Sequence, residues 1–183
     1  HLAEAEKVLP DLTDEELNYK PSPKAWSVAE VLDHLLTSLH EYYDKMDPAV
    51  RAATESDNHH DKPYQSGMIG GWLIGAVTNH NRKIPAPKLF KPKQKPEPTR
   101  SNYTFRIVDN YLSELNALLD RLESYEKYDL EAVRFYNPLS KLIRMKLGDA
   151  ILVQTHHLIR HWGQIQRVIA ARETSAGSAE ATD

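Results

Sequence analysis

The fold is decided by a stretch near the C-terminus, residues 149–172, which reads DAILVQTHHLIRHWGQIQRVIAAR. Its apolar side chains recur with the period of an α-helix, so we predict a long helix from about Gly148 to Arg172. With about 100° of rotation per residue, His161 falls about 40° from His157, on the same face. Within about 40° of His157 the same face also carries Ala150, Val153, Gln164 and Val168. Both histidines are therefore expected on the stripe that faces the protein interior.

A second amphipathic helix is predicted within the segment KPSPKAWSVAEVLDHLLTSLHEYYDKM, residues 20–46, after an approach that two prolines hold extended. Ser27 stands where an N-cap is expected, and Glu30 follows three residues later, as in a capping box. His34 lies one turn after Glu30, at the margin of the apolar stripe. That stripe comprises Val28, Val31, Leu32, Leu35, Leu39, Tyr42 and Met46.

The rest of the chain also favours helices. A short helix over residues 1–9 ends at Pro10, and Thr13 with Glu16 predicts a second capping box. Another helix is expected over 67–80, where glycines at every fourth residue leave a bare face for close packing. A further helix begins at Ser101 and has an apolar stripe made of Phe105, Val108, Tyr111, Leu112, Leu115, Leu118, Leu119 and Leu122.

The connections between these helices are long. Residues 82–100 hold five prolines and seven Lys or Arg, which favours an extended basic loop. Residues 124–148 are expected to form a loop with short turns. We therefore predict an all-α, four-helix bundle with a long Pro-rich connection. One domain would cover residues 1–172, and residues 173–183 would form a disordered tail.

Composition narrows the functional classes. The 183 residues include nine histidines and no cysteine, which excludes disulfides, iron–sulfur sites and a catalytic thiolate. The formal net charge of −3 gives no field for nucleic acid, so no such partner is expected. The most apolar run, Met68 to Val77, is about half the ~20 residues of a membrane span, so no membrane partner is expected either. With no recognisable export signal, we expect a cytoplasmic protein.

The histidines are candidate metal ligands. A pair spaced i, i+4 on one helical face can present two imidazoles to one ion, and His34 is the leading candidate for a third ligand. The alternative is that these are hydrogen-bonded core histidines. A ferritin-like site would need Glu-x-x-His motifs, and a zincin would need a Glu directly after His157, where Leu158 stands. The sequence therefore leaves a three-histidine mononuclear site or no metal site. His40, His59, His60 and His80 are expected at the surface.

Two segments carry a resemblance to a known family. The segment PSPKAWSVAEVLDHLL, residues 21–36, resembles the first metal-ligand helix of the DinB-like superfamily. The segment HHLIRHWGQI, residues 156–165, resembles the closing H-x-x-x-H-x-G-Q helix of that superfamily, which includes YfiT-like metal-dependent hydrolases and DinB-type thiol transferases. The resemblance implies a four-helix bundle, often a homodimer, with a divalent ion bound by His34, His157 and His161.

The implied ion is nickel or zinc. Members of known chemistry use it to activate a low-molecular-weight thiol (bacillithiol, mycothiol or glutathione) as a cosubstrate. We thus expect a small-molecule substrate and a metal-dependent hydrolase or thiol S-transferase. The alternative is a non-catalytic helical bundle that binds a ligand or partner, with structural or incidental metal binding.

The remaining polar residues near the expected site each have two interpretations. Glu30 is the candidate general base or catalytic acid, although a purely capping role competes with this. Gln164 either hydrogen-bonds a metal ligand or fills a polar gap. Arg160 and the basic residues of 82–100 either attract an anionic substrate or are simply solvated.

Overall fold

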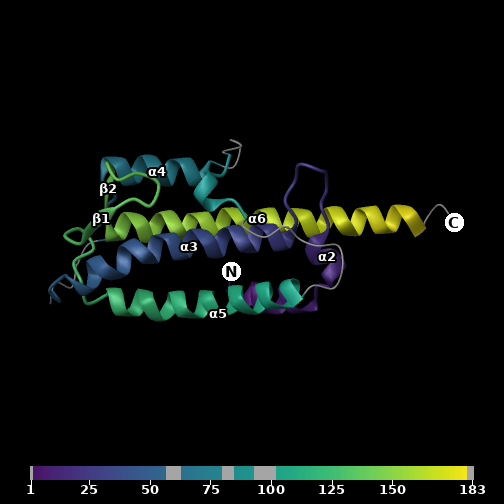
Figure 1. The fold of residues 1–183 in the computed structure, drawn as a ribbon, viewed down its shortest axis with the longest axis horizontal. Helices are drawn as coiled ribbons and strands as arrows, with labels where there is room; N and C mark the ends of the chain where they lie inside the picture. The colour runs from purple at the N-terminus through teal and green to yellow at the C-terminus, as the bar shows by residue number, and fades with distance from the viewer. Residues whose placement is uncertain (1, 57–62, 80–84, 93–101, 181–183) are drawn as a thin grey trace. The chain divides into compact units, whose positions relative to one another are not determined.

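The computed structural model describes residues 2–56, 63–79, 85–92 and 102–180, and these are mostly helical, as predicted (Figure 1). The α-helices are α1 (Leu2–Val8), α2 (Asp14–Asn18), α3 (Val28–Arg51), α4 (Met68–Thr78), α5 (Asn102–Tyr125) and α6 (Leu147–Glu180). Two 3-10 turns, η1 (Leu9–Asp11) and η2 (Lys88–Phe90), and two short strands, β1 (Arg134–Tyr136) and β2 (Arg144–Lys146), complete the described elements.

Both predicted capping boxes are present. At the start of α2, Glu16 N–H donates to the Thr13 hydroxyl, and Thr13 N–H donates to the Glu16 carboxylate at 2.8 Å. At the start of α3, Glu30 N–H donates to Ser27 Oγ at 3.2 Å, and Ser27 N–H donates to Glu30 Oε2 at 2.9 Å. Each box satisfies backbone donors that a helix start leaves without partners. The helix α3 then continues through Pro48 to Arg51, and every residue of its predicted apolar stripe is buried.

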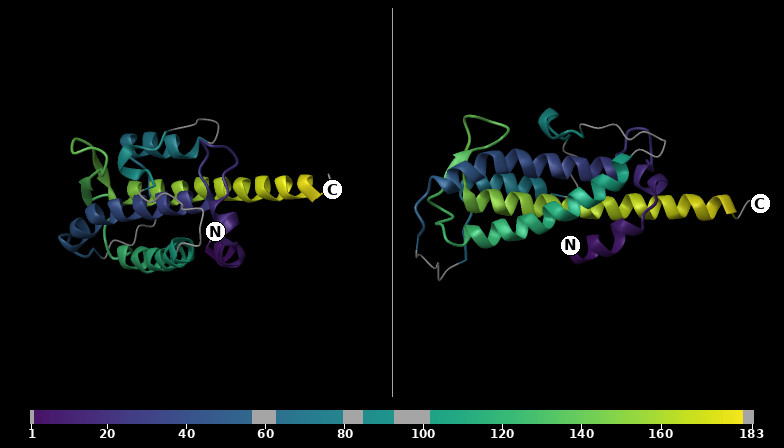
Figure 2. Two further views of the ribbon diagram at one scale, coloured as in Figure 1. Left: turned by 45° about the vertical axis from the view of Figure 1, so that its right-hand side comes forward. Right: turned by 60° about the horizontal axis from the view of Figure 1, so that its bottom comes forward.

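The chain divides into two compact units. The first comprises His1–Leu36, Pro92–Asn116 and His161–Asp183. Within it, the N-terminal helices lie along the C-terminal part of α6 (Figure 2). Glu4 accepts hydrogen bonds from Trp162 Nε1 at 2.7 Å and Gln166 Nε2 at 2.9 Å, and Glu15 pairs with Arg172 at 2.8 Å.

The second unit comprises Thr37–Lys91 and Ala117–Arg160. Residues 124–148 were predicted to be a loop, but they contain a two-stranded antiparallel sheet in which Phe135 pairs with Met145. Both side chains are buried in the core of this unit, and their burial stabilises the two strands. The strands are too short to show an alternating pattern in the sequence, so the sequence did not predict them. The Pro-rich segment likewise contains the turn η2, because Phe90 is buried in the same core with its ring 6.3 Å from that of Tyr42.

The helix α4 forms as predicted, but a different glycine is closely packed. Of the glycines expected to form the bare face, Gly71 and Gly75 have open space where a Cβ would be, and a Cβ on Gly67 would make only ordinary contact with Asp149 and Lys146. A Cβ on Gly70 would instead collide with the Asp149 carboxylate. Asp149 is buried and accepts hydrogen bonds from the Tyr64 hydroxyl at 3.0 Å and from Gly67 N–H at 3.2 Å, so it holds the start of α4 against α6.

Two helix predictions differ from the structure in detail. The helix α6 continues past its predicted end at Arg172 to Glu180, so the described part of the expected tail is helical and residues 181–183 lie outside the described chain. In α5, Leu119 was assigned to the apolar stripe but is 48% exposed. Ser101 and the side chain of Phe105 lie outside what is described. No helix in the described residues is long and apolar enough to cross a membrane.

Candidate metal centre

The centre is built around two histidines from distant parts of the sequence. His34 on α3 and His161 on α6 are 2% and 9% exposed. Their Nε2 atoms lie 3.2 Å apart, and their rings meet edge to face with centroids 4.6 Å apart. Two buried imidazoles with their ring nitrogens directed at each other require either a shared proton or a shared ion between them.

Gln164 sets the tautomer of His161. Its Oε1 lies 2.9 Å from His161 Nδ1, and an amide oxygen only accepts hydrogen bonds. With the amide oriented in this way, His161 Nδ1 carries the proton and donates it to Gln164. The lone pair of the neutral imidazole is then on Nε2, the nitrogen that faces His34. This is the tautomer that a metal ligand bound through Nε2 requires.

His157 completes the group from one turn earlier on the same continuous helix. One ring nitrogen from each of His34, His157 and His161 lies within 4.8 Å of the others. Two nitrogens bound to one ion at about 2.0–2.1 Å, with tetrahedral or octahedral angles, lie about 2.8–3.4 Å apart. The 3.2 Å between His34 and His161 falls in that range. The three residues therefore fit a divalent metal, and His157 is the half-buried member of the group.

Trp26 forms a wall beside the two buried histidines. Its ring centroid is 4.9 Å from that of His34 and 6.4 Å from that of His161, and it is nearly parallel to the latter. The residue precedes the N-cap of α3, so the capped helix start fixes its position relative to His34. Trp26 belongs to the segment of residues 21–36 that carries the family resemblance, but the sequence predicted no role for it. The sequence signal for such a role is its position directly before Ser27, the N-cap of the helix that carries the candidate ligand His34.

Glu30 lies one turn before His34 and has partners on both oxygens. Its Oε2 accepts from Ser27 N–H at 2.9 Å and Oε1 accepts from Lys20 Nζ at 3.1 Å. The capping role is thus present. A role as proton acceptor would require the carboxylate to exchange one of these partners.

Of the residues that the structure describes, Arg160 and His40 were also considered from the sequence, and neither is part of this group. Arg160 donates to the carbonyl oxygens of Asn79 at 2.6 Å and Val77 at 3.4 Å, so its guanidinium binds the end of α4. His40 is exposed, as predicted. His59, His60 and His80 lie outside the described residues.

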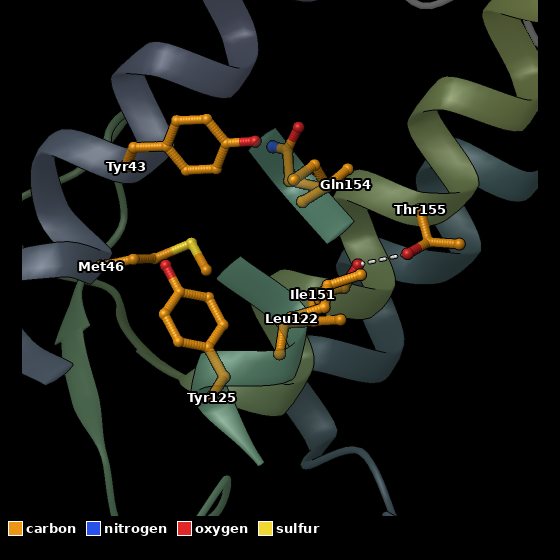
Figure 3. Close-up of a pocket in the computed structure, with 8 residues that line it drawn as sticks. Tyr43, Met46, Leu122, Tyr125, Ile151, Gln154 and Thr155 are labelled. Carbon is orange, nitrogen blue, oxygen red and sulfur yellow. Dashed lines mark hydrogen bonds between the residues drawn. The ribbon is translucent and has the colours of Figure 1, made fainter. Parts of the chain in front are cut away.

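A small cavity in the second unit contains none of these histidines. It has a volume of about 10 Å³, room for about one water, between α3, α5 and α6 (Figure 3). Among the described residues, Gln154 Oε1 at this cavity has no hydrogen-bond partner. Burial, with a hydrogen bond to Asp47, raises the pKa of Tyr125. Its hydroxyl therefore stays protonated at neutral pH. A cavity of this volume is too small for a substrate.

Fold and site together define a helical protein with a three-histidine group suited to a metal ion. The family model of the DinB superfamily matches residues 1–165. The chain therefore belongs to the DinB superfamily, and the matched range includes His34, His157, His161 and Gln164. No curated protein and no solved structure matches it.

Proposed function

We propose that this protein binds a divalent metal ion through His34, His157 and His161 and uses it to act on a small molecule. The observation that carries the proposal is the 3.2 Å separation of two buried Nε2 atoms, one of which is set as a lone-pair donor by Gln164. Nickel and zinc are the ions proposed, because neutral imidazoles suit both. The absence of cysteine means that any thiol in the reaction is supplied by a cosubstrate.

The chemistry follows from the ligand set. Three neutral imidazoles leave the charge of a divalent ion uncompensated, and such an ion lowers the pKa of bound water to about 7 or holds a thiol as thiolate. Gln164 holds His161 in the required tautomer, and the Trp26 ring covers one side of the histidine pair and keeps water from it. We propose hydrolysis or thiol S-transfer as the reaction class.

Metal binding is tested on the purified protein by elemental analysis and by calorimetric titration with Ni²⁺ and Zn²⁺. His157→Ala and His161→Ala should each lower affinity by at least about 100-fold, because an open three-ligand site becomes a two-ligand site. His40→Ala, which removes an exposed histidine from α3, is the matched control and should leave affinity unchanged. Equal affinity in all three variants would refute the proposed centre.

Activity is tested separately, with metal-loaded protein and a panel of esters, amides and thiol–electrophile pairs. Stoichiometric metal binding without turnover would support the non-catalytic alternative. If turnover is found, Glu30→Gln tests the proton acceptor, because a glutamine oxygen can still accept from Ser27 N–H and preserve the cap. Loss of turnover with unchanged metal affinity would support Glu30 as a base, and unchanged turnover would leave it only the capping role.

A further inference from the structure

The outer face of α4 is apolar and exposed. Met68 is 91% exposed, Trp72 is 69% exposed and Ile69 is 48% exposed, and the helix Met68–Thr78 contains no charged residue. Its inner face packs on the core of the second unit through Leu73, Ile74 and Val77. In Figure 1, α4 lies beside the first half of α6, with β2 near its start. A contiguous exposed apolar surface of this kind on a stable helix marks an interaction site.

The sequence around α4 carries a strong positive charge. Residues 62–96 include seven Lys or Arg and no Asp or Glu, although the whole chain has a net charge of −3. Within the described residues, Lys88 and Lys91 are exposed and flank Phe90. Phe90 packs on the same core cluster as the inner face of α4, so these two lysines are anchored in the same part of the unit.

From these two observations we infer that α4 docks on the surface of an anionic lipid bilayer, with Met68, Ile69 and Trp72 inserted among the lipids. Apolar side chains with a tryptophan on one face, supported by neighbouring cations, are the combination that binds an anionic interface. At 11 residues, α4 is about 16 Å long, so it lies at the interface and does not span the bilayer.

The main alternative occupant is a second copy of the chain. In a two-fold symmetric contact through α4, each copy presents the same surface. The contact would bring Lys88 and Lys91 of both copies towards one interface, where like charges oppose association. An anionic bilayer instead complements both the apolar face and the charge, so the charge distribution favours the membrane. This proposal departs from the expectation of no membrane partner, which rested on an apolar run too short to span a bilayer. The exposure of α4 is not visible in the sequence.

Vesicle co-sedimentation tests the proposal. The full chain should bind vesicles of phosphatidylcholine with phosphatidylglycerol, and this binding should fall with added salt, because screening weakens the attraction of the lysines. Vesicles of phosphatidylcholine alone should bind at least about tenfold less. In bound protein, Trp72 emission should shift to shorter wavelength and be quenched by brominated lipids, and Trp72→Phe should abolish the quenching.

Matched variants distinguish vesicle binding through α4 from non-specific adsorption of the protein. Ile69→Glu should reduce vesicle binding at least about tenfold, whereas Leu119→Glu on α5, at the same 48% exposure, should not. Lys88→Gln with Lys91→Gln should weaken binding and lower its salt dependence, whereas Lys45→Gln with Lys127→Gln should do neither. Circular dichroism verifies that each variant is folded.

Three results would overturn the proposal. One is no vesicle binding by the full chain. Another is equal binding to neutral and anionic vesicles. The third is a dimer in sedimentation velocity that Trp72→Glu converts to a monomer, without vesicle binding, which would identify α4 as a self-association surface. None of these results depends on the metal centre, so this inference and the proposed function fail independently.

Discussion

His34 and His161 stand 127 residues apart in sequence, yet their Nε2 atoms lie 3.2 Å apart in a buried setting. Each histidine is positioned by its own helix. For His34 this is α3, whose start is fixed by the Ser27–Glu30 capping box. His161 is oriented by Gln164, one turn later on α6, through its other ring nitrogen. Both imidazoles are thus held before any ion binds, which lowers the entropic cost of binding one.

Replacing Gln164 should weaken metal binding without removing a ligand. In Gln164→Leu, His161 Nδ1 loses its acceptor, so the ring can adopt the other tautomer and turn its lone pair away from the site. We expect about 10- to 100-fold weaker binding of Ni²⁺ or Zn²⁺ by calorimetry, the range typical for such supporting residues. Gln164→Glu, which keeps an acceptor oxygen, should retain most of the affinity.

Gln166→Leu provides the control for this comparison. Gln166 lies on the same helix but its side chain binds Glu4 instead of a histidine. Its replacement should leave the metal affinity unchanged. A Gln164→Leu protein that binds metal as tightly as Gln166→Leu would show that Gln164 only fills a polar gap.

Trp26 should report metal binding by its fluorescence. Its ring lies 4.9 Å from that of His34, and Ni²⁺ quenches tryptophan emission at short range. Titration with Ni²⁺ should therefore reduce the emission of the native protein with a midpoint that matches the calorimetric affinity. The quenching should be weaker in Trp26→Phe, in which Trp162 beside His161 remains, and unchanged in Trp72→Phe, since Trp72 lies on the exposed face of α4. Equal quenching in the two variants would place the bound ion elsewhere.

The sequence predicted the parts of the fold that depend on local chemistry. Both capping boxes and the full apolar stripe of α3 could be read from residue type and spacing, because hydrogen bonding across one helical turn and helical periodicity are local properties. The i, i+4 relation of His157 and His161 was visible for the same reason. His34 was the leading candidate for the third ligand from its position in the amphipathic helix. Nothing local connects His34 to α6, however, and the family resemblance supplied that connection.

The parts that could not be predicted depend on packing between distant segments. Strands β1 and β2 are three residues each and form because Phe135 and Met145 are buried side by side. The turn at Lys88–Phe90 is likewise held by the burial of Phe90. The regular spacing predicted close packing at Gly71 and Gly75, but the closely packed glycine is Gly70, because the spacing gives no information on where Asp149 lies. From the sequence, Arg160 was a candidate for attracting an anionic substrate, but its guanidinium donates to backbone carbonyls at the end of α4.

Alanine at Gly70 and at Gly71 should have opposite effects on stability. A Cβ at Gly70 collides with the Asp149 carboxylate, whose hydrogen bonds to Tyr64 and Gly67 resist its displacement. Gly70→Ala should therefore lower the free energy of unfolding by about 1–3 kcal/mol. A Cβ at Gly71 meets nothing within 4 Å, and alanine is the better helix former, so Gly71→Ala should raise it by about 0.5–1 kcal/mol. Urea denaturation measures both, and two changes of the same sign would contradict this packing.

The Thr13–Glu16 capping box should make a small part of the stability dependent on pH. Hydrogen bonds from the backbone and then the side chain of Thr13, with Arg172 as a weaker contributor, lower the pKa of Glu16 from its ordinary 4.5. A lowered folded-state pKa means that the folded protein binds fewer protons than the unfolded chain. The stabilisation is therefore complete above pH 4.5 and is lost as pH falls through the folded-state value.

Thr13→Ala removes the part of this effect that comes from the Thr13 hydroxyl, and it leaves the larger part, which comes from the backbone N–H of the same residue. It should cost about 0.5–2 kcal/mol near neutral pH, the usual range for an N-cap, and the pKa of Glu16 measured by NMR should rise only part of the way towards its ordinary value. The stability difference from the native protein should shrink in acid, since protonated Glu16 no longer accepts the Thr13 bonds as a carboxylate. Thr155→Ala, an exposed threonine inside α6, is the control and should leave the Glu16 titration unchanged. An unchanged Glu16 pKa in Thr13→Ala would show that the Thr13 hydroxyl does not contribute, and would assign the shift to the backbone N–H of this residue and to Arg172.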